Sequence, residues 1–264
     1  MPHRLSALAL HCLLTLMVLP SLHAQDSTHA QQDSTHAEQD STPAQQDSTR
    51  SWRLQADFGL VNTAGNSSTT TLNGAEQGSY LTGAWTFTQQ SSALYGESDG
   101  KKSAESYLVL LRTDYALSQW LGLYLLGQWD RNEFAGISRR FGEGVGLAYT
   151  AIALDRTTLS VEAGFTGNQQ RDVIGNTSNF VGGRGAILFR QMLNDKAYLD
   201  QVVEALPNFD NSQDVRINSE TSLVVPLSST IAFKAGYVVH FDNDPEPGFE
   251  KTDRYLTTGL QIVL

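Results

Sequence analysis

The strongest constraint on the fold is an alternation of apolar and polar residues that starts at Trp52 and continues to the C-terminus. In SWRLQADFGLVN the even positions from Trp52 to Leu60 are apolar, and TIAFKAGYVVHF repeats the pattern from Ile231 to Phe241. A period of two is that of a β-strand with one apolar and one polar face. The sequence therefore predicts an all-β domain.

Twelve runs of this kind can be distinguished. They cover residues 52–62, 69–81, 84–96, 104–116, 120–131, 139–150, 157–168, 178–190, 197–207, 214–225, 230–242 and 253–264. Most exceed the about 5–6 residues common in soluble sheets and reach the about 9–11 residues that a tilted strand needs to cross a bilayer. In lipid every backbone polar group needs a partner. We therefore predict a closed up-and-down antiparallel transmembrane β-barrel of about 12 strands.

The connectors between the runs also alternate in kind. Those after odd-numbered runs are longer and polar, such as TAGNSS, ESDGKKS and NDPEPGFEKT, whereas TG and LSQ after even-numbered runs are short. Long loops at one end and tight turns at the other are typical of outer-membrane barrels with periplasmic termini. Trp52, Trp85 and Trp120 near run starts, and Trp129 near a run end, fit two aromatic girdles at the membrane boundaries.

The first fifty residues read differently. Residues 1–24 combine His3 and Arg4 with the apolar stretch LSALALHCLLTLMVLP and end on Ala24, which predicts a secretory signal peptide. Residues 25–51 repeat QDSTHAQ-type heptads that contain no large apolar residue, so they predict a disordered tether. The expected organisation is a signal peptide (1–24), a repeat linker (25–51) and an outer-membrane barrel (52–264) in a Gram-negative cell.

The composition excludes several functions. The chain has 18 Lys+Arg against 28 Asp+Glu, a net charge of −10, which argues against a nucleic-acid partner. The single cysteine, Cys12, lies in the predicted signal peptide, which removes disulfides, cysteine zinc sites and thiol catalysis. His240 is the only histidine of the predicted barrel. We expect no catalytic residues, no cofactor and no metal site.

The candidate functional residues are the charged side chains that strand parity assigns to the barrel interior. Mixed signs on neighbouring strands favour ion pairs across the wall, and a charged lumen also fits a narrow path for small solutes. Gly142, Gly144 and Gly146 in FGEGVG are expected to leave space inside the wall. The expected lumen-lining residues are Arg53, Asp57, Glu76, Arg112, Asp114, Asp130, Arg140, Glu162, Arg184, Arg216, Glu220, Lys234, His240 and Arg254.

Several longer stretches resemble a known family. GLVNTAGNSSTTTLN, ALYGESDGKKSAESY, RTDYALSQW, FGEGVGLAY and above all LPNFDNSQDVRINSETSLVVPLSSTIAFKAGYVVHFDNDPEPGFEKTDRYLTTGL are similar to the salt-induced outer-membrane protein family of proteobacteria. The similarity covers residues 52–264. It implies an outer-membrane barrel of uncharacterised activity, brings no catalytic residues with it, and through the family's name implies a role in osmotic or salt adaptation.

The favoured function is that of a non-enzymatic envelope protein, either a narrow passive pore or a structural barrel. The expected partners are outer-membrane lipid, lipopolysaccharide and small solutes, with the amphipathic C-terminal strand delivering the chain to the barrel-assembly machinery. One alternative is a lipid-modifying enzyme that uses a serine with His240 as its base. Another is a soluble periplasmic barrel with an internal ligand, which the mean hydropathy of −0.27 favours.

The last long connector raises one further question. Asp242, Asp244 and Glu246 have the spacing of a calcium loop, although Gly248 comes one position late for the usual turn. Divalent cations that bridge these carboxylates to lipopolysaccharide phosphates are one reading of the segment. A solvated acidic loop is the other.

Overall fold

The computed structural model describes residues 51–63 and 69–263. The predicted signal peptide and all but the last residue of the repeat linker lie outside the described residues. The one described helix is η1 (Glu133–Ala135), a single 3₁₀ turn, and in this part of the chain no helix is long and apolar enough to span a membrane.

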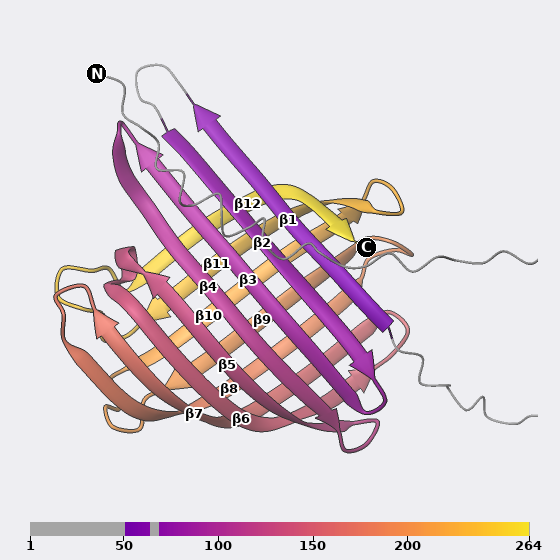
Figure 1. The fold of residues 1–264 in the computed structure, drawn as a ribbon. Coiled ribbons are helices and arrows are strands. Elements are labelled where there is room, and N and C mark those ends of the chain that lie inside the picture. Colours follow the sequence, from indigo (N-terminus) through magenta and orange to yellow (C-terminus); the bar gives the residue numbers. More distant parts are fainter. Residues whose placement is uncertain (1–50, 64–68, 264) are drawn as a thin grey trace, which may run out of the picture. The chain divides into compact units, whose positions relative to one another are not determined.

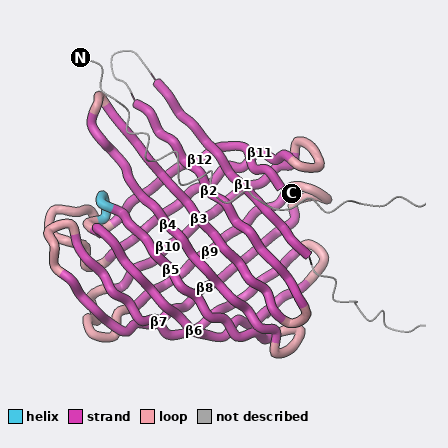
Figure 2. Tube along the Cα trace, in the orientation of Figure 1, coloured by secondary structure: helices cyan, strands magenta, loops and turns pink. Residues whose placement is uncertain are grey.

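The described residues form one closed antiparallel barrel (Figures 1 and 2). Each strand pairs with its neighbours in sequence, and β1 pairs with β12 to close the sheet. The prediction of a closed up-and-down barrel of twelve strands is therefore confirmed. The strands are β1 (Ser51–Thr63), β2 (Thr69–Thr82), β3 (Trp85–Ser98), β4 (Lys101–Ala116), β5 (Leu121–Asn132), β6 (Ile137–Ala153), β7 (Thr157–Asp172), β8 (Thr177–Met192), β9 (Tyr198–Pro207), β10 (Val215–Pro226), β11 (Ile231–Asp242) and β12 (Thr252–Val263).

The two ends of the barrel differ less in connector length than the sequence suggested. We call the end that carries connectors 83–84, 117–120, 154–156, 193–197 and 227–230 the turn end. At the opposite loop end, connectors 208–214 and 243–251 are long, but 133–136 and 173–176 are short. The expected loop ESDGKKS is a hairpin, because Asp99 and Gly100 both have positive φ (50° and 75°), as a two-residue type I′ turn requires.

The outer wall of the barrel is apolar. Phe58, Phe165 and Leu256 are 60%, 64% and 77% exposed, a distribution opposite to that of a soluble protein core. Aromatic rings gather on this wall at the turn end: Trp52 stacks on Tyr80 with ring centroids 4.3 Å apart. Trp85 and Tyr115 lie 4.6 Å apart on the neighbouring strands. An apolar band with an aromatic girdle is the surface expected of a membrane barrel.

Two charged residues lie on the face opposite to the one expected. Glu76 pairs with Ala56, which shares the outer face of β1 with Phe58, so Glu76 points outward. The run 69–81 has apolar residues of both parities, so its alternation does not fix the face. Arg254 pairs with Val239 and shares the outer face of β12 with Leu256. Pairing across strands, rather than the pattern within one strand, decides these two positions.

Candidate functional site

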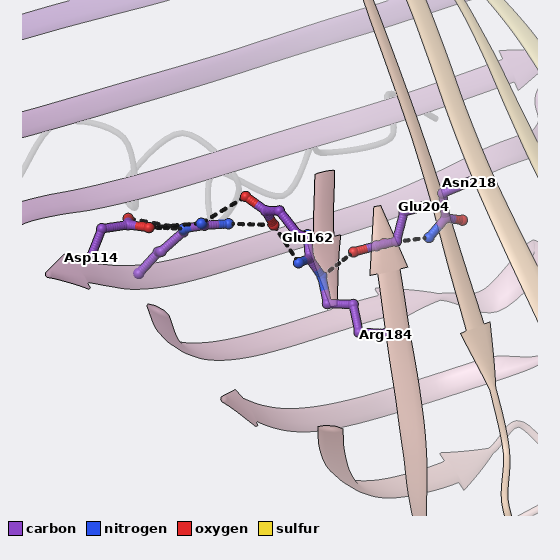
Figure 3. Close-up of polar contacts among 6 residues, drawn as sticks. Asp114, Glu162, Arg184, Glu204 and Asn218 are labelled. Atoms are coloured by element: carbon purple, nitrogen blue, oxygen red, sulfur yellow. Dashed lines mark hydrogen bonds and ion pairs between the residues drawn. The ribbon is translucent and has the colours of Figure 1, made fainter. Parts of the chain in front are cut away.

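A belt of ion pairs crosses the barrel interior (Figure 3). Arg112 on β4 binds Glu162 on β7 with two bonds of 2.8 and 2.9 Å. The other carboxylate contact of Glu162 is with Arg184 on β8, at 2.5 Å. Arg184 continues to Glu204 on β9 at 2.6 Å. Because β4 and β7 are not neighbours, the first of these pairs runs over β5 and β6 on the inside of the wall.

Polar partners extend the belt at both ends. Arg112 also binds Asp114, with Nη2 and Oδ1 2.7 Å apart. At the other end Asn218 on β10 donates to Glu204 at 3.0 Å, and Asn218 Oδ1 lies 2.8 Å from Nδ1 of His240 on β11. The belt therefore links strands from β4 to β11, and Glu162 at its centre is only 4% exposed. Because this buried carboxylate is paired with two arginines, its capacity to accept hydrogen bonds is well used.

Tyr124 on β5 forms the platform beneath the two arginines. Its ring centroid lies 4.5 Å from the guanidinium carbon of Arg112 and 5.2 Å from that of Arg184, both within cation–π range. The side chain is 1% exposed. A Cβ atom on Gly146 or Gly164 would lie 2.4 or 2.5 Å from its hydroxyl, so both positions must lack a side chain. The space expected at Gly146 is thus occupied by Tyr124, whereas Gly144 faces Leu126 and Gly142 faces Asn168.

A second group of charges lies beside the closure of the sheet. Lys234 on β11 lies 3.1 Å from Asp57 on β1 and 3.3 Å from Glu220 on β10. The Lys234–Asp57 pair passes over β12, so it joins the two sides of the seam between the first and last strands. Glu220 is the more exposed partner, with 44% of its side chain accessible.

Further pairs lie nearer the loop end. Arg140 on β6 binds Asp130 on β5 at 3.0 Å and reaches Gln170 on β7. Arg216 on β10 lies over the ring of Phe180, 5.5 Å from its centroid, and 3.7 Å from Asp214.

The expected lumen residues are therefore distributed unequally. Eleven of them fall in the three groups above: Asp57, Arg112, Asp114, Asp130, Arg140, Glu162, Arg184, Arg216, Glu220, Lys234 and His240. Arg53 has inner-face parity with Asp57 but is exposed at the turn end. Sequence reasoning missed Tyr124, Glu204 and Asn218. The only signal for these residues was their strand parity, which places them on the inner face. Tyr124 could not be told from an aromatic residue of the outer wall, and the run 197–207 that contains Glu204 alternates poorly.

The loop 243–251, which we call the mouth loop, reaches from β11 to the far side of the opening. A Cβ on Gly136, in the turn after η1, would lie 2.8 Å from Glu246 and 3.3 Å from Phe249, so the two segments are in contact. Figure 1 shows both segments at the same end of the barrel. Asn211 in the loop before β10 donates to Asp244 at 2.8 Å. The mouth loop thus spans between two walls of the loop end.

A cavity of about 360 Å³ lies under the mouth loop, lined by Phe249, Glu250 and Asp253 on one side and by Leu94, Glu105 and Asn132 on the other. In the described part of the chain, the carboxylates at the calcium spacing are not brought together. Among the described residues no three His, Cys, Asp or Glu side chains are grouped to hold a metal ion, and Asp242 instead accepts a bond from the backbone of Asp244.

Comparison with known families shows the family to which this barrel belongs. Residues 56–263 match the family described as Protein of unknown function, DUF481. Since the match covers most of the chain, the protein belongs to that family. No curated protein matches the chain.

Several solved structures resemble the barrel. The NanC porin has 11% identity and a TM-score of 0.46, over 81% of this chain and 98% of that one. The translocator domain of the autotransporter NalP from Neisseria meningitidis has 14% identity and a TM-score of 0.43, over 83% and 90%. An anion-selective porin from Comamonas acidovorans has 9% identity and a TM-score of 0.39, over 82% and 99%.

The close packing around Tyr124 gives a first prediction. Gly146→Ala places a methyl group against Tyr124 and the backbone oxygen of Ala163, and overpacking of this kind costs about 1–3 kcal/mol. Gly127→Ala on the adjacent strand is the matched control, because its Cβ meets nothing within 4 Å. Urea unfolding in lipid vesicles measures both. Equal stability of the two variants would contradict the packing described for Tyr124.

The central carboxylate gives a second prediction. Glu162→Gln leaves Arg112 and Arg184 without their shared anion, and removal of one partner from a buried ion pair costs about 3–5 kcal/mol. The same change at the exposed Glu220 is expected to cost less than about 1 kcal/mol. Denaturant titration of both variants checks the difference. A Glu162→Gln barrel as stable as the Glu220→Gln barrel would show that the belt does not hold the wall.

The mouth loop gives a third prediction. Burial, together with repulsion from Asp172, Asp242 and Asp244, raises the pKa of Glu246 in the docked loop. An acid with a raised pKa binds its proton more tightly in the docked state, so docking is favoured at acid pH and weakens as pH rises above the ordinary glutamate range. Hydrogen-exchange protection factors across 243–251 are expected to fall as the pH rises from about 4, near the ordinary pKa of glutamate, to about 7, well above it.

A matched pair of variants isolates the effect. Glu246→Gln removes the titrating group and is expected to keep the loop protected at both pH values. Glu250→Gln, at an exposed position of the same loop, should retain the pH dependence of the parent. Loss of protection in the Glu246→Gln loop at neutral pH would contradict the assignment.

Proposed function

We propose that this chain is an integral outer-membrane barrel that provides a narrow passive path for small solutes and has no enzymatic role. The observation that carries the proposal is the combination of a closed sheet, an exposed apolar outer wall and an interior crossed by ion pairs. Such a wall is stable in lipid, where the closed sheet leaves no unpaired edge.

The strand lengths and the aromatic rings support the placement in a membrane. Most strands have 12 residues or more, as in β5 and β6, which exceeds the about 9–11 needed to cross a bilayer. The Trp52–Tyr80 and Trp85–Tyr115 pairs mark one membrane boundary. The proposal includes export by residues 1–24, the linker 25–51 as a periplasmic tether, periplasmic termini, contact with lipid and lipopolysaccharide, and delivery to the assembly machinery by β12.

The belt and the mouth loop support a narrow path rather than a wide channel. Two arginines, two glutamates and Tyr124 project into the cross-section at the level of Glu162. The mouth loop spans one end. Only small solutes are therefore expected to pass. Acidic side chains around the loop end, including Asp214, Asp242 and Asp244, favour cations over anions.

The two rival functions receive less support from the geometry. A lipid-modifying enzyme would need His240 at the lipid-facing surface, whereas its Nδ1 lies beside Asn218 on the inner face. A soluble ligand-binding barrel would need a polar outer wall, whereas Phe165 and Leu256 are exposed there. The role in salt adaptation is carried by the family resemblance alone, and we include it in the proposal on that basis.

Planar-bilayer recording of the purified protein tests this function. Small conductance steps are expected, with a reversal potential in a salt gradient that shows preference for cations. Tyr124→Ala removes the platform beneath the arginines and is expected to enlarge the steps, while Tyr115→Ala on the outer wall should not. If the folded protein gave no conductance steps at any salt concentration, the pore proposal would be wrong and the barrel would have a purely structural role.

A further inference from the structure

Two arginines lie opposite each other on the outer wall at the loop end of the barrel. Arg139, near the start of β6, and Arg171, near the end of β7, are Cα partners on these neighbouring strands (Figure 1). Phe141 lies two residues from Arg139 and is 49% exposed on the outer wall, so both arginines share its face. Both side chains are exposed. We call these two residues the arginine pair.

The arginine pair lacks an anionic partner among the described residues. Other basic side chains at this end have one: Arg131 on β5 binds Glu133, and Arg140 binds Asp130. In the described part of the chain no ion pair reaches Arg139 or Arg171. Like charges directly opposite each other on neighbouring strands destabilise a sheet. A bridging anion would convert this repulsion into attraction.

The neighbouring outer-face positions do not supply that anion. On β8 the outer-face residues beside Arg171 are Thr177 and Asn179, which are uncharged. On β6 the nearest outer-face acid is Glu143, four residues from Arg139. At about 3.3 Å per residue, four residues correspond to about 13 Å along the strand, which is too far for an ion pair.

A surface pocket of about 350 Å³ lies beside the arginine pair, lined by the two arginines, Ser138 and residues 172–175. Ser138 is the extra residue of a β-bulge, because the pairing of β6 with β7 passes from Ile137 directly to Arg139. Bulges of this kind change the direction of side chains at the rim of a barrel. Val173 and Ile174, 41% and 76% exposed, give the pocket an apolar side.

The one carboxylate in the lining is committed to its own turn. Asp172 is 5% exposed. Its Oδ1 accepts from the backbone N–H groups of Gly175 and Asn176, at 2.6 and 2.8 Å. Its Oδ2 accepts from the amide of Asn176 at 2.8 Å. The pocket therefore offers a ligand two exposed guanidinium groups and an apolar side.

The arginine pair lies at the edge of the apolar band. The outer face of β6 carries Phe141, Val145 and Leu147, which are 49%, 43% and 47% exposed. With a rise of about 3.3 Å per residue and a tilt of about 40°, the backbone of Arg139 lies about 5 Å beyond that of Phe141 along the membrane normal. This is the level of lipid headgroups rather than of acyl chains.

We infer that the arginine pair binds the phosphate group of a lipid headgroup in the leaflet at the loop end. A guanidinium group presents a planar fork of donors that matches phosphate oxygens. One phosphate between Arg139 and Arg171 accepts from both forks and cancels their repulsion. The organic part of the headgroup packs on Val173 and Ile174, a contact that inorganic phosphate cannot make.

This inference rests on the proposed membrane location and orientation. With periplasmic termini the loop end faces outward, where lipopolysaccharide is the phosphate-bearing lipid. The site lies on the outer wall, so it concerns how the barrel is held in the membrane rather than what passes through it.

Lipid binding by the parent protein tests the site without a substitution. The folded barrel in a non-ionic detergent is titrated with the phosphate-bearing lipid anchor of lipopolysaccharide, and the complex is measured by native mass spectrometry. Removal of the phosphates from the lipid is expected to weaken binding about tenfold or more, as loss of charge-assisted hydrogen bonds does. Equal binding of the dephosphorylated lipid would overturn the inference. Displacement of the lipid by an equal concentration of inorganic phosphate would show a general anion site and overturn the lipid assignment.

Substitutions locate the site on the barrel. Arg139→Gln and Arg171→Gln are each expected to weaken binding of the phosphorylated lipid about tenfold or more, with the heat-modifiable gel mobility of a folded barrel retained. Arg254→Gln removes another exposed outer-face arginine at the loop end, on β12, and should bind like the parent.

The outcomes separate this inference from the proposed function. Binding by Arg139→Gln and Arg171→Gln that equals binding by Arg254→Gln would overturn the arginine-pair site alone. If either variant fails to fold, the comparison of phosphorylated with dephosphorylated lipid on the parent decides the inference. A parent protein found outside the membrane would overturn the proposed function.

Discussion

Closure of the sheet between β1 and β12 is the contact on which the rest of the structure depends. The strands pair from Gln55–Val263 to Phe58–Leu260, and they approach closely because two positions lack side chains. A Cβ on Gly59 would lie 2.3 Å from the carbonyl oxygen of Thr258, and one on Gly259 would lie 2.3 Å from that of Phe58. Without this seam, two rows of backbone groups would face lipid unpaired, at a cost of several kcal/mol for each group.

The interior ion pairs connect strands of this closed wall that are not neighbours. The Lys234–Asp57 pair spans the seam, and the Arg112–Glu162 pair spans two intervening strands. Ion pairs in a barrel interior gain little net free energy over apolar contacts, but an unpaired charge there is costly. The pairs therefore favour one register of distant strands over others. They also occupy the cross-section of the barrel, so the features that specify the wall are those that narrow its interior.

Much of this architecture was predictable from the alternation of residues, and particular failures show its limits. In strongly alternating runs such as 230–242, the pattern predicted both the strand and the residues that face outward, because the apolar residues Ile231, Phe233 and Tyr237 all lie on the same side of the strand. In the run 69–81, Tyr80 and Leu81 are adjacent and disagree, so Glu76 was assigned to the wrong wall, and only its pairing with Ala56 corrects it. For Arg254 the apolar positions of its own strand already indicated the outer wall.

The candidate site was less accessible to sequence reasoning than the fold. Arg112 and Glu162 were expected in the interior, but their contact depends on the stagger of strands that are not neighbours, and no local pattern encodes that stagger. The mouth loop is a similar case, since its contact with Gly136 joins segments from distant strands. The hairpin at Asp99–Gly100 was encoded locally, because an Asp-Gly pair favours the positive φ values of a type I′ turn.

The central claim is that the closed sheet is a membrane-embedded barrel, and cell fractionation followed by gel electrophoresis with and without boiling tests it most directly. The account predicts that the chain is found in the outer-membrane fraction, and that the unboiled band migrates differently from the boiled one because the closed sheet resists detergent. A soluble periplasmic product whose mobility is unchanged by boiling would contradict it.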